Sequence, residues 1–144
     1  MAGSQSASPR PVSPSRPKRR FTLAQANKSL ALVSRIVSDI VHTHQSVTEL
    51  HEKLETTKVA REQKPLQDRL ESENRHLQEY VDELADVGCE LKDFQTGLVD
   101  FIGRHQGRDV YLCWKLGETE IQYWHELHTG FAGRQTVSSL EESA

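Results

Sequence analysis

The sequence has few of the residues that constrain small proteins through covalent or metal links. Its 144 residues include only two cysteines, Cys89 and Cys113, whose spacing matches neither a disulfide framework nor a zinc ribbon. No apolar run reaches the roughly 20 residues that cross a bilayer, and the N-terminus has no apolar signal core. Nucleophile-elbow, P-loop and HExxH motifs are absent. We therefore expect a cytoplasmic protein with no membrane span, and the missing motifs argue against an enzyme without excluding one.

Proline and charge are distributed very unevenly. Residues 1–20 hold four of the five prolines, many serines and five basic residues with no acid, which predicts a disordered basic tail. The other 124 residues keep 13 of the 18 basic residues and all 21 acidic ones, a net charge of −8. An acidic body disfavours nucleic-acid binding by the folded part. The tail could bind nucleic acid weakly, although the simpler interpretation is a solubilising extension.

Two long helices are predicted after the tail. Thr22 and Gln25 form a capping-box pattern, with Phe21 at the hydrophobic-staple position just before it. Apolar residues then recur in steps of three and four as far as Leu54. A second such series follows Pro65. The spacing predicts helices over about 22–57 and about 65–95. Since a short polar link joins them, we expect an antiparallel, coiled-coil-like hairpin.

The C-terminal third has a different pattern. Two β-prone runs, residues 110–116 and 121–127, are separated by a glycine-containing turn, which is typical of a β-hairpin. A third strand could come from residues 98–102. The fold predicted is mainly α, a long helical hairpin with a small antiparallel β-hairpin or three-stranded sheet over about 98–127. Residues 138–144 are expected to form a flexible acidic tail.

Several motifs resemble one protein family. They are FTLAQAN at 21–27, GLVDF at 97–101, GRDVYLCW at 107–114, Gly117-Glu118, YWH at 123–125 and GFAGRQ at 130–135. In this order they resemble DUF2203, a prokaryotic family catalogued as a domain of unknown function, over roughly residues 21–137. The resemblance implies a single domain with a helical hairpin and a small β element, and it implies no activity.

Ionisable and aromatic side chains gather in the same C-terminal stretch. The candidate cluster consists of Asp100, Glu118, His125 and Arg134, flanked by Trp114 and Trp124. One interpretation is a buried polar network that fixes the sheet to the helices. Another is a small-anion site, with Arg134 as a planar fork for carboxylate or phosphate and the tryptophans as walls.

Two chemical interpretations remain open. A metal site could use His125 with Cys113, His128, Glu118 or Asp100, and zinc would suit such N, S and O donors. Because side chains alternate across a strand, His125 and His128 could share an ion only if the strand turned after His125. Alternation also predicts Tyr111 with Cys113 on one face and Trp114 on the other. The last interpretation is hydrolysis, with His125 as a base oriented by a carboxylate.

From these features we expect a non-enzymatic binding or protein-interaction module. A two-helix hairpin leaves apolar surface uncovered, so we also predict a homodimer, and a further protein partner is conceivable. The alternative is an anion-binding or metal-dependent enzyme whose site surrounds Asp100, Glu118, His125 and Arg134.

Overall fold

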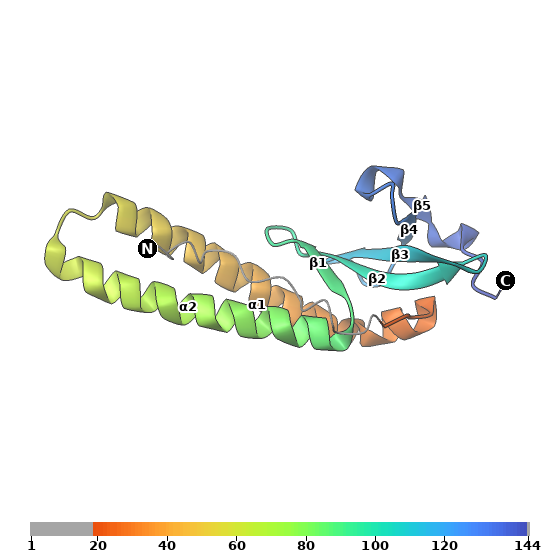
Figure 1. Ribbon diagram of the computed structural model, residues 1–144, viewed down its shortest axis with the longest axis horizontal. Coiled ribbons are helices and arrows are strands. Elements are labelled where there is room, and N and C mark those ends of the chain that lie inside the picture. The colour runs from red at the N-terminus through yellow and green to blue at the C-terminus, as the bar shows by residue number, and fades with distance from the viewer. Residues whose placement is uncertain (1–18, 144) are drawn as a thin grey trace.

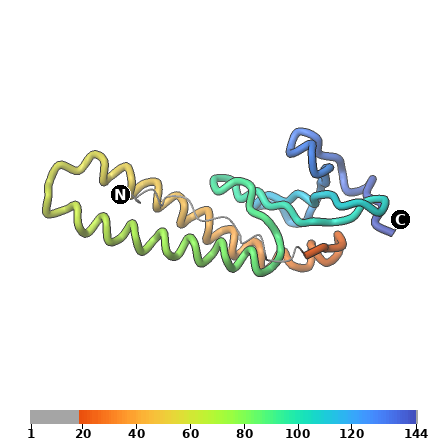
Figure 2. The backbone as a smooth tube through the Cα atoms, in the orientation of Figure 1, coloured from red at the N-terminus to blue at the C-terminus, as the bar shows by residue number. Residues whose placement is uncertain are grey.

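A computed structural model describes residues 19–143, and it consists of a helical hairpin followed by one antiparallel sheet (Figures 1 and 2). The helices are α1 (Leu23–Thr56) and α2 (Ala60–Val87). The strands are β1 (Glu90–Asp93), β2 (Leu98–His105), β3 (Arg108–Lys115), β4 (Tyr123–Glu126) and β5 (Gln135–Thr136). Two short 3-10 turns, η1 (Phe131–Gly133) and η2 (Val137–Ser139), complete the chain. The predicted tail lies outside the described residues, apart from Arg19 and Arg20.

Helix α1 begins with the predicted capping box, which is confirmed. The Thr22 hydroxyl accepts a hydrogen bond from the Gln25 backbone N–H at 3.0 Å, and Gln25 Oε1 accepts one from the Thr22 N–H at 2.9 Å. Together these bonds satisfy two helix-terminal donors. Helix α2 starts at Ala60, five residues before the predicted start, and Pro65 lies inside it. Within residues 19–143, neither helix is long and apolar enough to cross a membrane.

The sheet is larger than predicted, because it has five strands in the order β1-β2-β3-β4-β5. The prediction of two or three strands is wrong, because it misses the two edge strands, β1 and β5. Residues 90–93 continue the helical spacing of α2, but Gly88 adopts a left-handed conformation with φ of +110° and ends the helix. The chain then turns back as β1 and pairs with β2. Strand β5 has only two residues, too few to give a recognisable pattern.

The core lies between one face of the sheet and the open end of the hairpin. Val99, Phe101, Leu112 and Trp114 point from the sheet into this core, where the rings of Phe21 and Phe101 meet edge to face at 5.1 Å. The tip of the hairpin extends away from the sheet (Figure 1). The helical hairpin therefore does not pack on the other face of the sheet, and the candidate site lies on that face.

The described part of the acidic C-terminal segment, within the 138–144 region predicted to be a flexible tail, makes hydrogen bonds to the domain. The Glu141 N–H donates to His105 Nδ1 at 3.0 Å, and the Gln106 N–H donates to the Glu141 carbonyl at 2.8 Å. Glu142 accepts a hydrogen bond from the Leu23 N–H at the start of α1. A carboxylate at a helix N-terminus is favourably placed, so the Glu142 carboxylate helps to hold this segment against α1.

Gly97 and Gly117 offer a matched pair of substitutions at positive φ, +76° and +106°. A Cβ at Gly97 would lie 2.8 Å from Val37 Cγ1, whereas a Cβ at Gly117 meets nothing within 4 Å. Gly117→Ala should therefore cost about 1 kcal/mol of backbone strain. Gly97→Ala should cost about 1–2 kcal/mol more, because it also overpacks the core. Urea unfolding of both variants measures the difference, and equal losses would contradict the packing at Gly97.

Candidate metal centre

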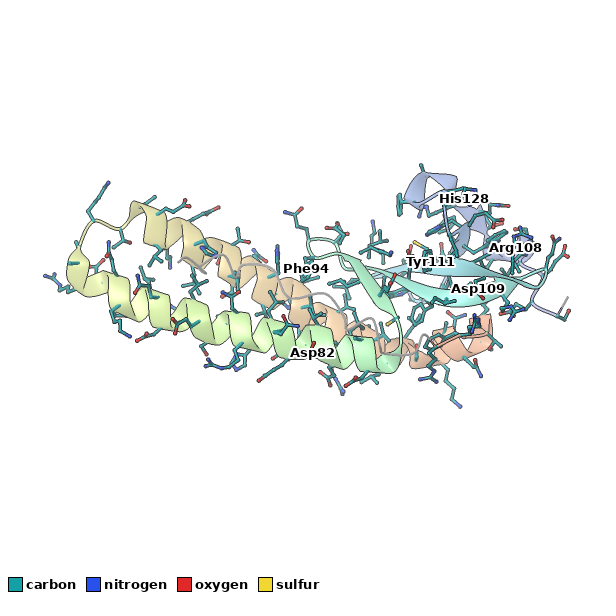
Figure 3. The ribbon with its side chains drawn as sticks, viewed as in Figure 1. Asp82, Phe94, Arg108, Asp109, Tyr111 and His128 are labelled. Atoms are coloured by element: carbon teal, nitrogen blue, oxygen red, sulfur yellow. The ribbon has the colours of Figure 1, made fainter. Side chains whose placement is uncertain are left out.

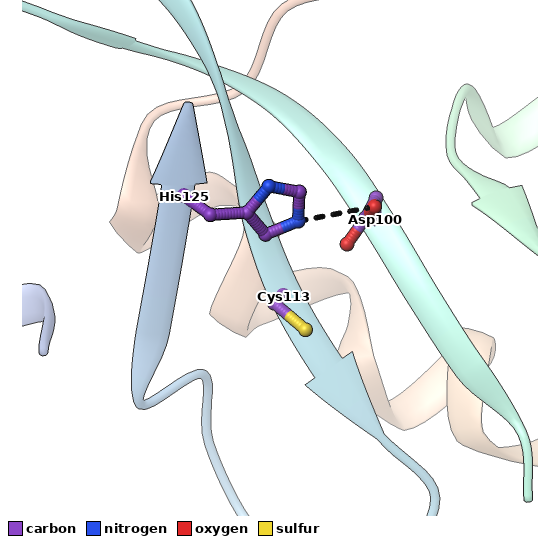
Figure 4. A group of neighbouring side chains, drawn as sticks. All are labelled: Asp100, Cys113 and His125. Carbon is purple, nitrogen blue, oxygen red and sulfur yellow. Dashed lines mark ion pairs between the residues drawn. The ribbon is translucent and has the colours of Figure 1, made fainter. Parts of the chain in front are cut away.

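Strand pairing brings three side chains together on the face of the sheet that points away from α1 and α2. Asp100 on β2 lies opposite Cys113 on β3, and His125 on β4 lies opposite Tyr111 on β3. The three residues Asp100, Cys113 and His125 thus occupy adjacent positions on three neighbouring strands. Figure 4 shows the His125 ring reaching over β3 toward Asp100, with Cys113 beside them. We call these residues the Asp–Cys–His group.

The group is compact and almost completely buried. Asp100, Cys113 and His125 are 4%, 3% and 3% exposed. One ligand atom from each, a carboxylate oxygen, Sγ and a ring nitrogen, lies within 4.8 Å of the other two. His125 Nε2 and Asp100 Oδ2 are 3.4 Å apart. That is longer than the ~2.8 Å of a charge-assisted hydrogen bond. It matches the ~3.4 Å edge between N and O ligands about 2.0–2.1 Å from a tetrahedral zinc ion.

The backbone fixes which nitrogen of His125 is available to the group. His125 Nδ1 lies 2.8 Å from the carbonyl oxygen of Glu126. A carbonyl can only accept, so Nδ1 carries the proton and donates. In the neutral ring Nε2 therefore presents its lone pair to Asp100. A lone pair facing an ionised carboxylate is unfavourable unless a proton or a cation lies between them, and a backbone bond at the remote nitrogen is typical of metal-binding histidines.

Asp100 is incompletely satisfied in its buried position. Its Oδ1 has no hydrogen-bond partner among the described residues, although it is shielded from solvent. Burial raises the pKa of Asp100, while the neighbouring His125 and Lys92 side chains oppose the shift. An orphaned buried carboxylate oxygen is costly in a purely structural network. A bound cation would supply the missing partner.

Cys113 is held as a thiol when no ion is bound. Burial raises the pKa of Cys113 to about 12, and the nearby Asp100 charge adds to the shift. A cysteine hydrolase needs the opposite, because its imidazole accepts the thiol proton through one nitrogen and is oriented through the other. The Nδ1 bond of His125 to the Glu126 carbonyl orients the ring and leaves Nε2 free to accept a proton or to ligate an ion. It is the raised pKa of the Cys113 thiol that disfavours a nucleophilic role for this residue.

Replacing Asp100 by asparagine should stabilise the metal-free protein by roughly 1 kcal/mol. The amide keeps the shape, removes a buried charge and can donate to His125 Nε2. The pKa of Asp100 is raised on folding. The stability that its protonated form contributes to the wild type is therefore complete below the unfolded pKa, and it is lost as pH rises through the folded pKa. The advantage of Asp100→Asn should thus grow from acid to neutral pH in chelator-containing urea titrations.

Asp93 provides a control of opposite sign for this experiment. Hydrogen bonds from Thr96 and Gln95 lower the pKa of Asp93, so Asp93→Asn should lose stability above the unfolded pKa. If both asparagine variants lose stability at neutral pH, the Asp100 carboxylate does not destabilise the metal-free protein, and the prediction for Asp100→Asn is wrong.

The Asp–Cys–His group forms the floor of a pocket of about 200 Å³. Its walls combine polar and apolar residues, namely Lys92, Leu98, Tyr111, Leu127, Gly130 and Phe131. The Lys92 ammonium lies 4.8 Å from the centre of the Tyr111 ring and 3.0 Å from Glu90 Oε1. Leu127 and Phe131 are 51% and 46% exposed, which is high for large apolar side chains. The pocket therefore has a polar floor and an apolar mouth.

The other residues of the predicted cluster have separate places. Glu118 lies in the turn after β3, where Oε1 accepts from the Lys115 N–H at 2.9 Å and its carbonyl accepts from Trp114 Nε1 at 2.9 Å. Arg134 stacks on two rings, with Cζ 4.4 Å from the centre of Tyr123 and 3.8 Å from that of Phe131. The structure thus brings Asp100 and His125 together, with Cys113 rather than Glu118.

The tryptophans and His128 lie away from the group. Trp114 and Trp124 are 1% and 2% exposed and belong to the core on the helix-facing side of the sheet, so they do not flank the group. His128 is exposed beyond the end of β4 (Figure 3), outside the set of converging ligand atoms. The aromatic residues that do border the pocket are Tyr111 and Phe131. Alternation along β3 already places Tyr111 beside Cys113, whereas no local signal marks Phe131 or Lys92.

Comparison with known proteins gives one family and no individual relative. Residues 19–137 match the family model described as an uncharacterized conserved protein, DUF2203. Neither the curated proteins nor the solved structures contain a match. The matched segment includes both helices, all five strands and every residue of the Asp–Cys–His group. The chain therefore belongs to the DUF2203 family.

Proposed function

We propose that the protein is a metal-binding module that holds one zinc ion between Asp100, Cys113 and His125. The observation that carries the proposal is the convergence of three buried donor atoms within 4.8 Å of one another, at a carboxyl group whose Oδ1 has no hydrogen-bond partner among the described residues. The sequence led us to expect a non-enzymatic binding module, and this proposal names zinc as its ligand. It shares the metal centre with the alternative, a metal-dependent enzyme, but it does not require catalysis.

Zinc fits the donors better than a hard cation does. Thiolate and imidazole are ligands of borderline and soft ions, whereas magnesium and calcium prefer oxygen. The fixed tautomer of His125 presents Nε2 with its lone pair free, as a zinc ligand requires. Both cysteines are free thiols, which supports a reducing compartment such as the cytoplasm.

Metal content after refilling tests the proposal directly. Protein stripped with a chelator and dialysed against buffered zinc should contain about one zinc per chain by elemental mass spectrometry. Cys113→Ser and His125→Asn should each reduce the zinc content strongly. Cys89→Ser and His128→Asn are matched controls, since Cys89 is the other buried thiol and His128 an exposed imidazole outside the group.

Two outcomes would overturn the metal function. One is wild-type protein that takes up no zinc although it is folded by circular dichroism. The other is equal zinc content in the Cys113 and His125 variants and in the controls. The predicted homodimer is a separate proposal, supported by exposed Leu32 and Val59 on the helical hairpin, and sedimentation of the purified protein tests it.

A further inference from the structure

The Asp–Cys–His group supplies three ligands, and zinc takes four. Within residues 19–143 the converging set contains only Asp100, Cys113 and His125, with no fourth histidine, cysteine or carboxylate. Three protein ligands with one open position are typical of zinc sites that bind water or an exogenous ligand. The pocket is lined by all three of these residues, so the space above the group is where the fourth ligand must come from.

Next to the pocket lies a positive charge, that of Arg134, which has no ion-pair partner among residues 19–143. Arg134 is stacked on Phe131, which is itself a wall of the pocket. Among the described residues no carboxylate pairs with Arg134, and its guanidinium N–H groups make no hydrogen bond, so they are available as donors. Lys92 is the cationic side chain that lines the pocket itself, and it is paired with Glu90 at 3.0 Å. Arg134 is therefore the group best placed to recognise an anion approaching the ion.

The mouth of the pocket adds an apolar requirement. Leu127 and Phe131 are large, exposed and adjacent to a concave polar floor, an arrangement typical of ligand sites. The volume of about 200 Å³ is below the roughly 300–1,000 Å³ of sites for drug-sized molecules. A nucleotide or a large cofactor is thus too big, and a small organic acid is the class that fits.

We infer that the fourth position of the zinc ion takes the carboxylate of a small monocarboxylic acid, whose apolar body lies against Leu127 and Phe131 and whose charge is matched by Arg134. This inference rests on the proposed metal function. The zinc ion and Arg134 would favour a ligand with a negatively charged carboxylate. Leu127 and Phe131 would favour a ligand whose remaining atoms are apolar.

Cobalt substitution separates the inference from the function on which it rests. Protein loaded with Co²⁺ in place of zinc should show a thiolate-to-cobalt absorption band and d–d bands, because Cys113 ligates the ion. Benzoate should change the d–d bands, acetate should do so only at about tenfold higher concentration, and the uncharged isostere benzamide should leave them unchanged.

Two variants test the recognising side chains. Arg134→Gln should weaken benzoate binding about tenfold while the cobalt spectrum without benzoate stays unchanged, and Arg35→Gln, an exposed arginine on α1, should have no effect. Phe131→Ala should weaken benzoate and spare acetate, which has no ring to contact Phe131.

The outcomes identify which claim fails. If no thiolate-to-cobalt band appears in folded protein, the metal function is overturned, together with the inference. If the band appears but benzoate leaves the spectrum unchanged, the metal function stands and the inference is overturned. Equal benzoate affinity in wild type and Arg134→Gln also overturns the inference.

Discussion

Zinc at about a thousand times its dissociation constant is expected to raise the free energy of unfolding by about 4 kcal/mol, or roughly 10–20 °C in melting temperature. The gain arises because strand pairing creates the Asp–Cys–His group only in the folded chain. In the unfolded chain Asp100, Cys113 and His125 are separated by more than ten residues each and bind the ion poorly. Differential scanning calorimetry across a zinc series measures the gain.

The pH dependence of stability should change when zinc is present. In the metal-free protein the pKa of Cys113 is raised to about 12, so the folded state holds its proton more tightly than the unfolded state. That contribution is complete below the unfolded pKa near 9 and is lost as pH rises from about 9 to 12. Zinc requires the thiolate, so the zinc-dependent gain should instead increase as pH rises toward 8.

Cys89 gives the background for this comparison. Burial raises its pKa to about 12 as well, but Cys89 is outside the group, so its contribution is the same with and without zinc. The quantity to compare is therefore the difference between the two pH profiles. A difference that stays constant from pH 6 to pH 8 in wild type would contradict thiolate ligation. In Cys113→Ser the difference should be close to zero.

The helical hairpin could be predicted because its signals are local. The capping box at Thr22 and Gln25, together with the apolar stripe that follows, depends on residues three and four positions apart. The second helix was extended too far, because Leu91 and Phe94 continue the stripe of α2. Gly88 in its left-handed conformation ends that helix, and a prediction from the apolar spacing alone runs past it.

The site could be predicted in part. His125 and Asp100 stand out as ionisable residues in β-prone runs, and alternation correctly separates Tyr111 and Cys113 from Trp114. What the sequence does not contain is the register of β2 and β4 against β3, which determines that Cys113 rather than Glu118 joins the pair. Sequence proximity made the tryptophans look like walls of the site, although one step along a strand moves a side chain to the other face.

Trp124→Ala is expected to cost about 3–5 kcal/mol of stability, because it empties a large part of the core on the helix-facing side of the sheet. The Trp124 ring is 2% exposed and stacks on His105 with ring centres 4.3 Å apart. Its Nε1 donates to Ser139 Oγ at 3.0 Å, which ties the C-terminal segment to β4. Trp124→Phe keeps most of the packing and loses this hydrogen bond, so it should cost less, about 1–2 kcal/mol.

The same pair of variants tests whether the two faces of the sheet act independently. Trp124 and His125 are neighbours in sequence, but the first supports the core and the second faces the pocket. If the faces are independent, Trp124→Phe should start from a lower stability and still gain the full zinc increment of about 4 kcal/mol. Calorimetry of wild type and Trp124→Phe, each with zinc and with chelator, gives this double-difference cycle. An increment reduced by more than about 1 kcal/mol would mean that core packing holds the zinc ligands in place. A full increment would mean that backbone pairing of β2, β3 and β4 is sufficient to form the site.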